Sequence, residues 1–250
     1  MSVQAESRSG YAANKERKNL IAAWNWGRKY IDPPLPDKNP FCVERMPEKR
    51  TPRYVPPEED FWKVFETTQG QDRVMILTFL HIAARKGEVF RLTWQDVDFE
   101  NARIRLWTQK RRGGNMEYDW LPLTKELFSA LSWWRAETPF PDQDYVFVNL
   151  DDTPFCNEYL GKPFKVRVQF MRRLCDRAGV KRFGFHAIRH LSASILYKQG
   201  CDVAVIQRIL RHRSPNTTSI YLRSLGAEDV RNALDDLPTT GRASKTKFSW

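Results

Sequence analysis

The chain has 250 residues, of which 41% are hydrophobic, and its 41 lysines and arginines outnumber its 30 aspartates and glutamates. The resulting net charge of +11 at pH 7 is spread along the chain and favours a polyanionic partner such as nucleic acid. The polar first twenty residues argue against an export signal, and the apolar run 74–84 is far shorter than the ~20 residues of a membrane span, so we expect a cytoplasmic protein that does not enter a membrane.

The first 54 residues are predicted to form a region separate from the rest. Residues 14–30 carry Leu20, Ala23 and Trp24 at helical spacing, which predicts a helix. Residues 31–57 contain eight prolines among many charged residues, a composition typical of an extended linker. We therefore expect a second domain to begin near residue 55.

The chain beyond this point is predicted to be mainly helical, with one short β segment. Residues 102–107 alternate, a turn follows at 111–115, and a second extended run covers 117–123, which predicts an antiparallel hairpin or part of a three-stranded sheet. Helical periodicity predicts helices at 58–68, 72–84, 86–92, 124–135, 162–178, 186–199, 203–211, 216–223 and 226–235. The expected fold class is therefore α+β, mainly helical with a small antiparallel sheet.

The most informative stretch is His-Ala-Ile-Arg-His at 186–190. His186 and Arg189 lie one turn apart on the same face of the predicted helix, with His190 beside them. The opposite face carries an apolar set at helical spacing, namely Ile188, Leu191, Ile195 and Leu196. A packed helix is thus expected to present a basic edge. Arginine and histidine together suit an oxyanion such as a phosphodiester, which arginine binds through two N–H groups while histidine moves a proton near neutral pH.

A second short helix and a tyrosine extend this pattern. Asp202 is a predicted N-cap for a helix that His212 follows. The apolar stripe of this helix consists of Val205, Ile206, Ile209 and Leu210. Tyr221 lies nine positions after His212, beyond the break at Ser214-Pro215. This order and spacing of His-x-x-Arg, Leu-x-His and Tyr resembles the carboxy-terminal signature of the tyrosine recombinases, also called the phage integrase family.

The resemblance covers most of the chain after residue 55. Residues 83–98 resemble the first box of the integrase catalytic domain, which implies that Arg85 is its first catalytic arginine and Glu88 its supporting acidic residue. The family usually has Thr-Gly before that arginine, whereas this chain has Ile82-Ala83. This departure puts the local backbone in question and leaves the charged residues in place.

A basic turn also matches the family. Residues 107–114 lie where the family carries a lysine on a β-hairpin, which implies a catalytic role for Lys110. Arg111 and Arg112 are the expected DNA-binding neighbours. The alternative is that this turn is basic only because it faces solvent.

The resemblance implies a site-specific recombinase that cleaves and rejoins DNA, for integration or excision of a mobile element. Tyr221 would be the nucleophile that forms a 3′-phosphotyrosyl bond, and Arg85 and Arg189 would bind the non-bridging oxygens of the phosphate. Lys110 would protonate the departing 5′ oxygen. The other implied members are His186 for proton transfer at the tyrosine, His212 as a hydrogen-bond donor to the phosphate, and His190 as a supporting residue.

The resemblance also implies partners and domain limits. No cofactor and no metal ion are expected, and four widely spaced cysteines favour reduced thiols over a zinc site. Double-stranded DNA is the implied partner, with a monomer alone and a homotetramer on synapsed sites. Residues 1–54 are interpreted as a remnant of the family's core-binding domain plus a linker, residues 55–225 as the catalytic domain, and residues 226–250 as a helix and basic tail that docks on a neighbouring subunit.

Two other functions stay open at this point. A type IB topoisomerase shares the nucleophile and the arginines, although the chain is short and Leu-Arg-His-Arg-Ser is integrase-like. A catalytically silent DNA-binding domain is the second alternative, and loss of Arg85 or Tyr221 would favour it. Each residue also has a structural reading, in which Tyr221 packs in the core, Glu88 is a surface acid and His190 is merely exposed.

Overall fold

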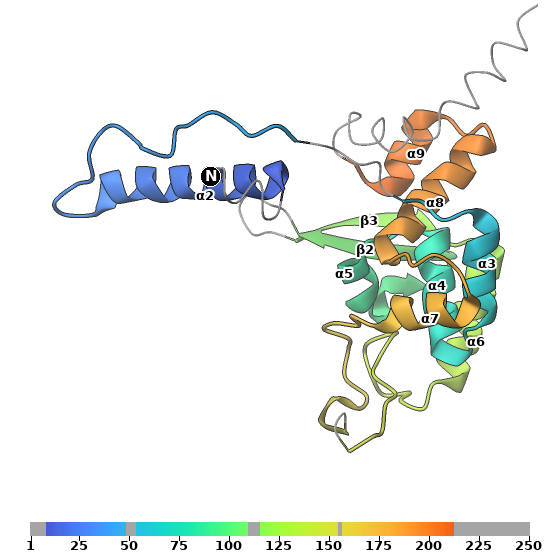
Figure 1. The fold of residues 1–250 in the computed structure, drawn as a ribbon. Coiled ribbons are helices and arrows are strands. Elements are labelled where there is room, and N and C mark those ends of the chain that lie inside the picture. Colours follow the sequence, from blue (N-terminus) through green and yellow to red (C-terminus); the bar gives the residue numbers. More distant parts are fainter. Residues whose placement is uncertain (1–8, 49–53, 110–115, 155–156, 213–250) are drawn as a thin grey trace, which may run out of the picture. The chain divides into compact units, whose positions relative to one another are not determined.

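The computed structural model describes residues 9–48, 54–109, 116–154 and 157–212. The chain divides into two compact units, Met1–Pro52 and Arg53–Trp250 (Figure 1). The first unit contains the predicted amino-terminal helix, and the second contains the remaining described helices and the sheet.

The first unit is one long helix, α2 (Gly10–Tyr30), with an extended segment packed along it. The helix begins four residues earlier than predicted because the Ser9 side chain caps it, accepting a hydrogen bond from the Ala12 backbone N–H at 3.1 Å. The segment after α2 returns along the helix. Asn14 exchanges hydrogen bonds with the Met46 backbone, and the Trp24 indole N–H donates to the Pro36 carbonyl at 3.1 Å. Residues 31–48 of the proline-rich segment are therefore extended, as predicted, and are also held by hydrogen bonds to the helix.

The second unit surrounds a helix that is buried on almost every side. Its elements in chain order are α3 (Glu58–Glu66), α4 (Gly70–His81), α5 (Lys86–Phe90), η1 (Trp94–Asp96), β1 (Val97–Asp98), β2 (Arg103–Gln109), β3 (Met116–Pro122), α6 (Lys125–Glu137), η2 (Asn157–Tyr159), α7 (Phe170–Ala178), α8 (Phe185–Lys198) and α9 (Val203–Leu210). The central helix α4 packs against α6 and α8. Its residues Val74 to Leu77 and Phe79 are buried, which confirms the prediction of a buried helix.

The three strands form an antiparallel sheet in the order β1-β2-β3, which confirms the predicted β segment. In the long pairing, Arg103 lies opposite Pro122 and Gln109 opposite Met116. The alternation of side chains places Ile104 and Leu106 in the core. Asp96 joins η1 to the sheet, because it accepts hydrogen bonds from the Arg105 guanidinium and the Trp107 indole.

Two predicted helix limits are wrong. The helix predicted over 72–84 ends at His81, because Ala83 adopts a left-handed backbone with φ of 44°, which stops helical hydrogen bonding. The helix predicted over 162–178 begins only at Phe170. Val166 and Val168 are exposed, and Pro163 lies in an isolated bridge to Val148, so this stretch does not pack as a helix.

The other predicted helices in this unit match within a few residues, and those at 216–223 and 226–235 lie outside the described residues. Among the described residues, no helix combines the length and the apolar character needed to cross a membrane.

Candidate active site

The site begins at the turn that precedes α5. Ala83 takes the left-handed conformation at the position where the resemblance leads us to expect glycine. This turn delivers Arg85 to the N-cap of α5, where its backbone N–H donates to the Glu88 Oε2 atom at 2.7 Å. A glutamate at the third helical position that accepts from the N-cap backbone is a capping interaction. The departure from Thr-Gly thus leaves the backbone path intact.

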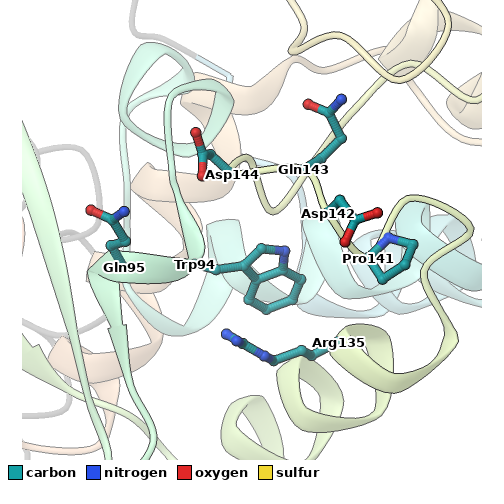
Figure 2. A pocket seen from close by; sticks show the side chains of 7 residues that line it. All are labelled: Trp94, Gln95, Arg135, Pro141, Asp142, Gln143 and Asp144. Atoms are coloured by element: carbon teal, nitrogen blue, oxygen red, sulfur yellow. The ribbon is translucent and has the colours of Figure 1, made fainter.

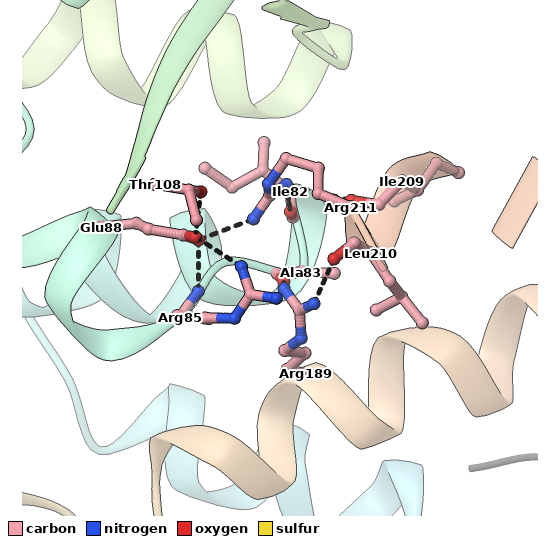
Figure 3. Close-up of polar contacts among 9 residues, drawn as sticks. All are labelled: Ile82, Ala83, Arg85, Glu88, Thr108, Arg189, Ile209, Leu210 and Arg211. Carbon is pink, nitrogen blue, oxygen red and sulfur yellow. Dashed lines mark hydrogen bonds and ion pairs between the residues drawn. The ribbon is translucent and has the colours of Figure 1, made fainter. Parts of the chain in front are cut away.

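Glu88 is the centre of the site. Its side chain is 3% exposed, and both oxygens accept hydrogen bonds from other parts of the fold (Figure 3). Oε1 accepts from Arg85 Nη1 at 2.8 Å and from Thr108 Oγ1 on β2 at 3.0 Å. Oε2 also accepts from Arg211 Nη2 at 2.6 Å, just after α9. The reading of Glu88 as a surface acid is therefore wrong.

Glu88 stays ionised in this setting. Burial by itself would raise the pKa of Glu88, but the charges of Arg211 and Arg85 and the hydrogen bonds from Arg85 outweigh burial and lower that pKa below its ordinary value. A fixed negative charge at this point orients the arginines around it.

The two predicted phosphate-binding arginines lie in this cluster with different exposure. The Arg85 side chain is 40% exposed, so part of its guanidinium faces solvent. Arg189 on α8 is only 1% exposed, and its guanidinium donates to the backbone carbonyls of Ala83 and Leu210 (Figure 3). Arg189 thus ties the turn before α5 to the end of α9, and Arg85 is the arginine that meets solvent.

The predicted basic edge of α8 is only partly present. His186 is exposed, and its ring lies 4.8 Å from that of His190 in an edge-to-face arrangement. His190 and Arg189 are buried, so the prediction of an exposed edge is wrong for these two residues. The physical reason is that α8 packs against three helices, α3, α4 and α9. These helices cover residues beyond the apolar stripe of α8.

His212 follows α9 directly and is also buried. Its backbone N–H donates to the Gln207 carbonyl, and the Gln207 side-chain amide donates to the His212 carbonyl at 3.0 Å. Burial, followed by the positive charges of Arg189, Arg85 and Arg211, lowers the pKa of His212 to about 4. The imidazole is therefore neutral at pH 7 and has one N–H to donate.

The helix that precedes His212 was predicted to have an apolar stripe of four residues. The structure places two of them in the core. Ile206 and Leu210 are fully buried and Ile209 packs against their cluster, whereas Val205 is exposed. The burial of Ile206 and Leu210 is sufficient to hold α9 against α8.

Arg211 is the residue that sequence reasoning missed. Its side chain is 4% exposed, and its backbone takes a left-handed conformation with φ of 52° at the end of α9. Helices commonly end in this conformation, and glycine is the usual residue there. An arginine at this point, next to a motif histidine, was the one signal available in the sequence.

Four predicted residues lie outside the described residues. These are Lys110, Arg111 and Arg112, which follow β2 in the sequence, and the nucleophile candidate Tyr221. Thr108, which donates a hydrogen bond to Glu88, lies on β2, two positions before Lys110.

A shallow hollow in another part of this unit shares no residue with the cluster. Its lining consists of Trp94, Gln95, Arg135, Pro141, Asp142, Gln143 and Asp144 (Figure 2). The Arg135 guanidinium lies over the Trp94 ring at 5.2 Å from its centre and occupies one side of the hollow. Because no predicted catalytic residue lines it, we assign the hollow no part in the site.

Comparisons with known proteins agree with this geometry. The model of the phage integrase family matches residues 58–228. Transposase A from transposon Tn554 of Staphylococcus aureus is 28% identical over 172 residues, which cover 65% of this chain and 46% of that protein. The tyrosine recombinase XerA of Thermococcus onnurineus is 27% identical over 206 residues, which cover 82% of this chain and 65% of that protein. The chain thus spans about half the length of the first relative and about two thirds of the second.

A solved structure confirms the fold class. The integrase of transposon Tn1549, in complex with a circular intermediate DNA, superposes with a TM-score of 0.68 at 18% identity, covering 94% of this chain and 82% of that one. The expected mainly helical α+β fold with a small antiparallel sheet is therefore correct. Because the family model matches well over half of the chain, this protein belongs to the phage integrase family.

Proposed function

We propose that this chain is a site-specific DNA recombinase that cleaves and rejoins DNA strands through a 3′-phosphotyrosyl intermediate. The observation that carries the proposal is a cluster of positive groups: Arg85 and Arg211 both donate to the Glu88 carboxylate (Figure 3), and the charges of Arg189, Arg85 and Arg211 act on His212. The three guanidinium groups outnumber the two carboxylates beside them, Glu88 and Asp119, which leaves a positive excess. Such an excess beside a solvent-facing arginine favours a phosphate as ligand.

The arrangement fits the electrostatic needs of phosphodiester cleavage. Charge develops on the non-bridging oxygens in the transition state, and donors fixed in advance stabilise it without reorganising. Arg85 is fixed by Glu88 and still faces solvent, so it binds one such oxygen. His212, neutral at pH 7, donates a hydrogen bond to the phosphate, and Arg189 supplies positive charge from behind the turn.

The bond changes follow from the predicted roles. The Tyr221 hydroxyl attacks phosphorus, forming a Tyr–O–P bond as the bond from phosphorus to the 5′ oxygen breaks. His186 takes the tyrosyl proton, and Lys110 donates a proton to the departing 5′ oxygen; positioned acids and bases of this kind each contribute ~10²–10⁴-fold. The phosphotyrosyl bond keeps the energy of the broken diester, so the 5′ hydroxyl of the same or another strand rejoins without ATP.

We propose that the protein acts on duplex DNA and that it does so in the cytoplasm. The net charge of +11 supports it, and so does the Tn1549 integrase, which was solved in complex with DNA. The relative from transposon Tn554 supports a role in moving or excising a mobile element. We propose a monomer in the absence of DNA and a homotetramer on two synapsed sites, with residues 226–250 docking on a neighbouring subunit.

The test is recovery of covalent protein–DNA adducts. Wild-type protein and Tyr221→Phe are incubated with fragmented DNA of the source genome, denatured in SDS, and the protein-linked fragments are sequenced. We expect wild-type adducts at one or a few recurring sites and none with Tyr221→Phe. Adducts scattered over many sites, with relaxation of supercoiled plasmid, would indicate a topoisomerase instead. Retention of DNA without any adduct would indicate a catalytically silent binding domain.

A further inference from the structure

Glu88 has no capacity for a further hydrogen bond. An ionised carboxylate offers about four lone-pair sites. In the structure these are filled by Arg85 Nη1, the Arg85 backbone N–H, Thr108 Oγ1 and Arg211 Nη2. Arg85 therefore donates only one side-chain N–H to Glu88, and its other guanidinium N–H groups remain for a different acceptor.

Arg211 holds its place on Glu88 by several contacts. Its Nη2 atom lies 2.6 Å from Glu88 Oε2, and its Nη1 atom donates to the carbonyls of Ile209 and Ile82. The Arg211 and Glu88 side chains are 4% and 3% exposed, so water does not compete for this pair. The left-handed backbone of Arg211 is uncommon for a residue other than glycine, which indicates that the side-chain contacts hold it there.

We propose that Arg211 is a positioning residue for Arg85. Arg211 occupies one lone pair of the Glu88 Oε2 atom, so Arg85 cannot pair with Glu88 through two side-chain N–H groups. The Arg85 guanidinium is thereby left directed at the DNA phosphate. The proposal rests on the proposed function, because it explains how one catalytic arginine stays available for the phosphate although a buried carboxylate lies beside it.

Loss of Arg211 has two consequences for the site. The lone pair of Glu88 Oε2 that Arg211 leaves is taken by a second side-chain N–H of Arg85, which turns the guanidinium away from the phosphate. With only Arg85 left to oppose burial, the pKa of Glu88 also rises. Protonated Glu88 then no longer orients Arg85, so the acid limb of the cleavage profile moves to higher pH.

The polar and titratable groups that act on this pair lie at the start of α5, on the sheet and just after α9, where the charge of Arg211 acts on His212. Arg85 faces Glu88 from the start of α5, and Thr108 on β2 contacts it without titrating. Asp119 on β3 and Arg85 act on Arg211 through space. Of these, Glu88 is the buried carboxyl group whose pKa the loss of Arg211 raises.

The experiment compares three full-length variants on a nicked DNA that traps the covalent adduct. Arg211→Gly removes the side chain and suits the left-handed backbone, and Arg211→Lys keeps the charge. Arg182→Gly is the control, because Arg182 forms an exposed ion pair with Asp176 at 2.6 Å and touches no residue of the cluster. We expect Arg211→Gly to slow cleavage about 10²-fold at pH 7.5, the loss typical of a catalytic group displaced by ~1 Å.

Two further results are expected. The acid limb of the pH profile shifts to higher pH in Arg211→Gly and stays in place in Arg182→Gly, while Arg211→Lys recovers most of the rate. Non-covalent DNA binding by Arg211→Gly stays near the wild-type value, since Arg211 is buried. A folded Arg211→Gly protein that cleaves at the wild-type rate with an unchanged acid limb overturns the proposal. If that variant does not fold, Arg211→Gln, which fills the space without charge, takes its place.

A second measurement separates this proposal from the proposed function. The ¹³C signal of the Glu88 carboxyl and the Nε–H signal of Arg85 are followed by NMR, which needs no DNA and no activity. We expect a higher pKa for Glu88 and slower rotation of the Arg85 guanidinium in Arg211→Gly than in wild type. If wild type forms no adduct but these signals change as expected, the proposed function fails and the positioning role of Arg211 stands; unchanged signals overturn that role.

Discussion

The burial of Glu88 makes the substitution Glu88→Gln strongly destabilising. The change keeps the shape of the side chain but removes its charge, which leaves Arg211 with a side chain 4% exposed and no anion beside it. The amide also replaces one acceptor oxygen with a donor, so two of the four donors that converge on Glu88 lose their acceptor. Breaking a buried ion pair by removing one partner costs about 3–5 kcal/mol.

The size of this effect separates it from an ordinary surface change. Glu66 and Arg73 form an exposed pair at 3.1 Å, with side chains 67% and 40% exposed, so Glu66→Gln is the matched control. Exposed pairs contribute about 0.2–1 kcal/mol. For a domain of this size, each kcal/mol lowers Tm by about 2–4 °C, which gives roughly 6–20 °C for Glu88→Gln and less than about 4 °C for the control.

Urea unfolding at pH 7, followed by the fluorescence of the nine tryptophans, measures both variants against wild type. The free energy of unfolding should fall by about 3–5 kcal/mol for Glu88→Gln. The double variant Glu88→Leu/Arg211→Met, which removes both charges, should recover a large part of this loss. A loss below about 1 kcal/mol for Glu88→Gln, equal to that of the control, would refute the view that Glu88 organises the site.

Three further outcomes are expected. Arg85→Ala should reduce the rate of adduct formation about 10²–10³-fold while leaving the fold intact, and a loss below about tenfold would place the phosphate elsewhere. The pKa of His212 is about 4 when folded and near 6.5 when unfolded, so the unfolded chain binds the proton first and stability falls as pH drops from 6.5 towards 4. His212→Asn should flatten this slope in urea titrations across that range, and an unchanged slope would contradict the neutral, buried imidazole. Ala102→Gly should stabilise the protein by about 1 kcal/mol, since Ala102 is exposed with φ of 48°, and a lower Tm would contradict this.

The sequence predicted the helices best where apolar residues repeat at helical spacing and packing follows that spacing. For α6, α8 and α9, the predicted and observed limits differ by no more than two residues. The prediction failed at 162–169, where the valines at positions 166 and 168 are exposed and no helix forms. A residue-type pattern cannot distinguish an apolar residue that packs from one that does not when the partner surface lies elsewhere in the chain.

The residues of the candidate site were predictable from their types and order, whereas their contacts were not. Arg85, Glu88 and His212 are gathered as the motif implies. The burial of Arg189 depends on the carbonyl of Ala83, 106 positions away, and that of Arg211 on Glu88, 123 positions away. Local periodicity contains no information on such distant partners, so Arg189 was assigned without its structural contacts and Arg211 was missed.

The most direct test of the central claim identifies the residue that becomes joined to DNA. Wild-type adduct is digested with trypsin and nuclease, and the modified peptide is sequenced by mass spectrometry. Cleavage after Arg213 and Arg223 releases Ser214–Arg223, in which Tyr221 is the one tyrosine among several serines and threonines. We predict a nucleotide attached to Tyr221 through its 3′ phosphate. Attachment to another residue or through a 5′ phosphate, or an adduct that persists in Tyr221→Phe, would contradict the account.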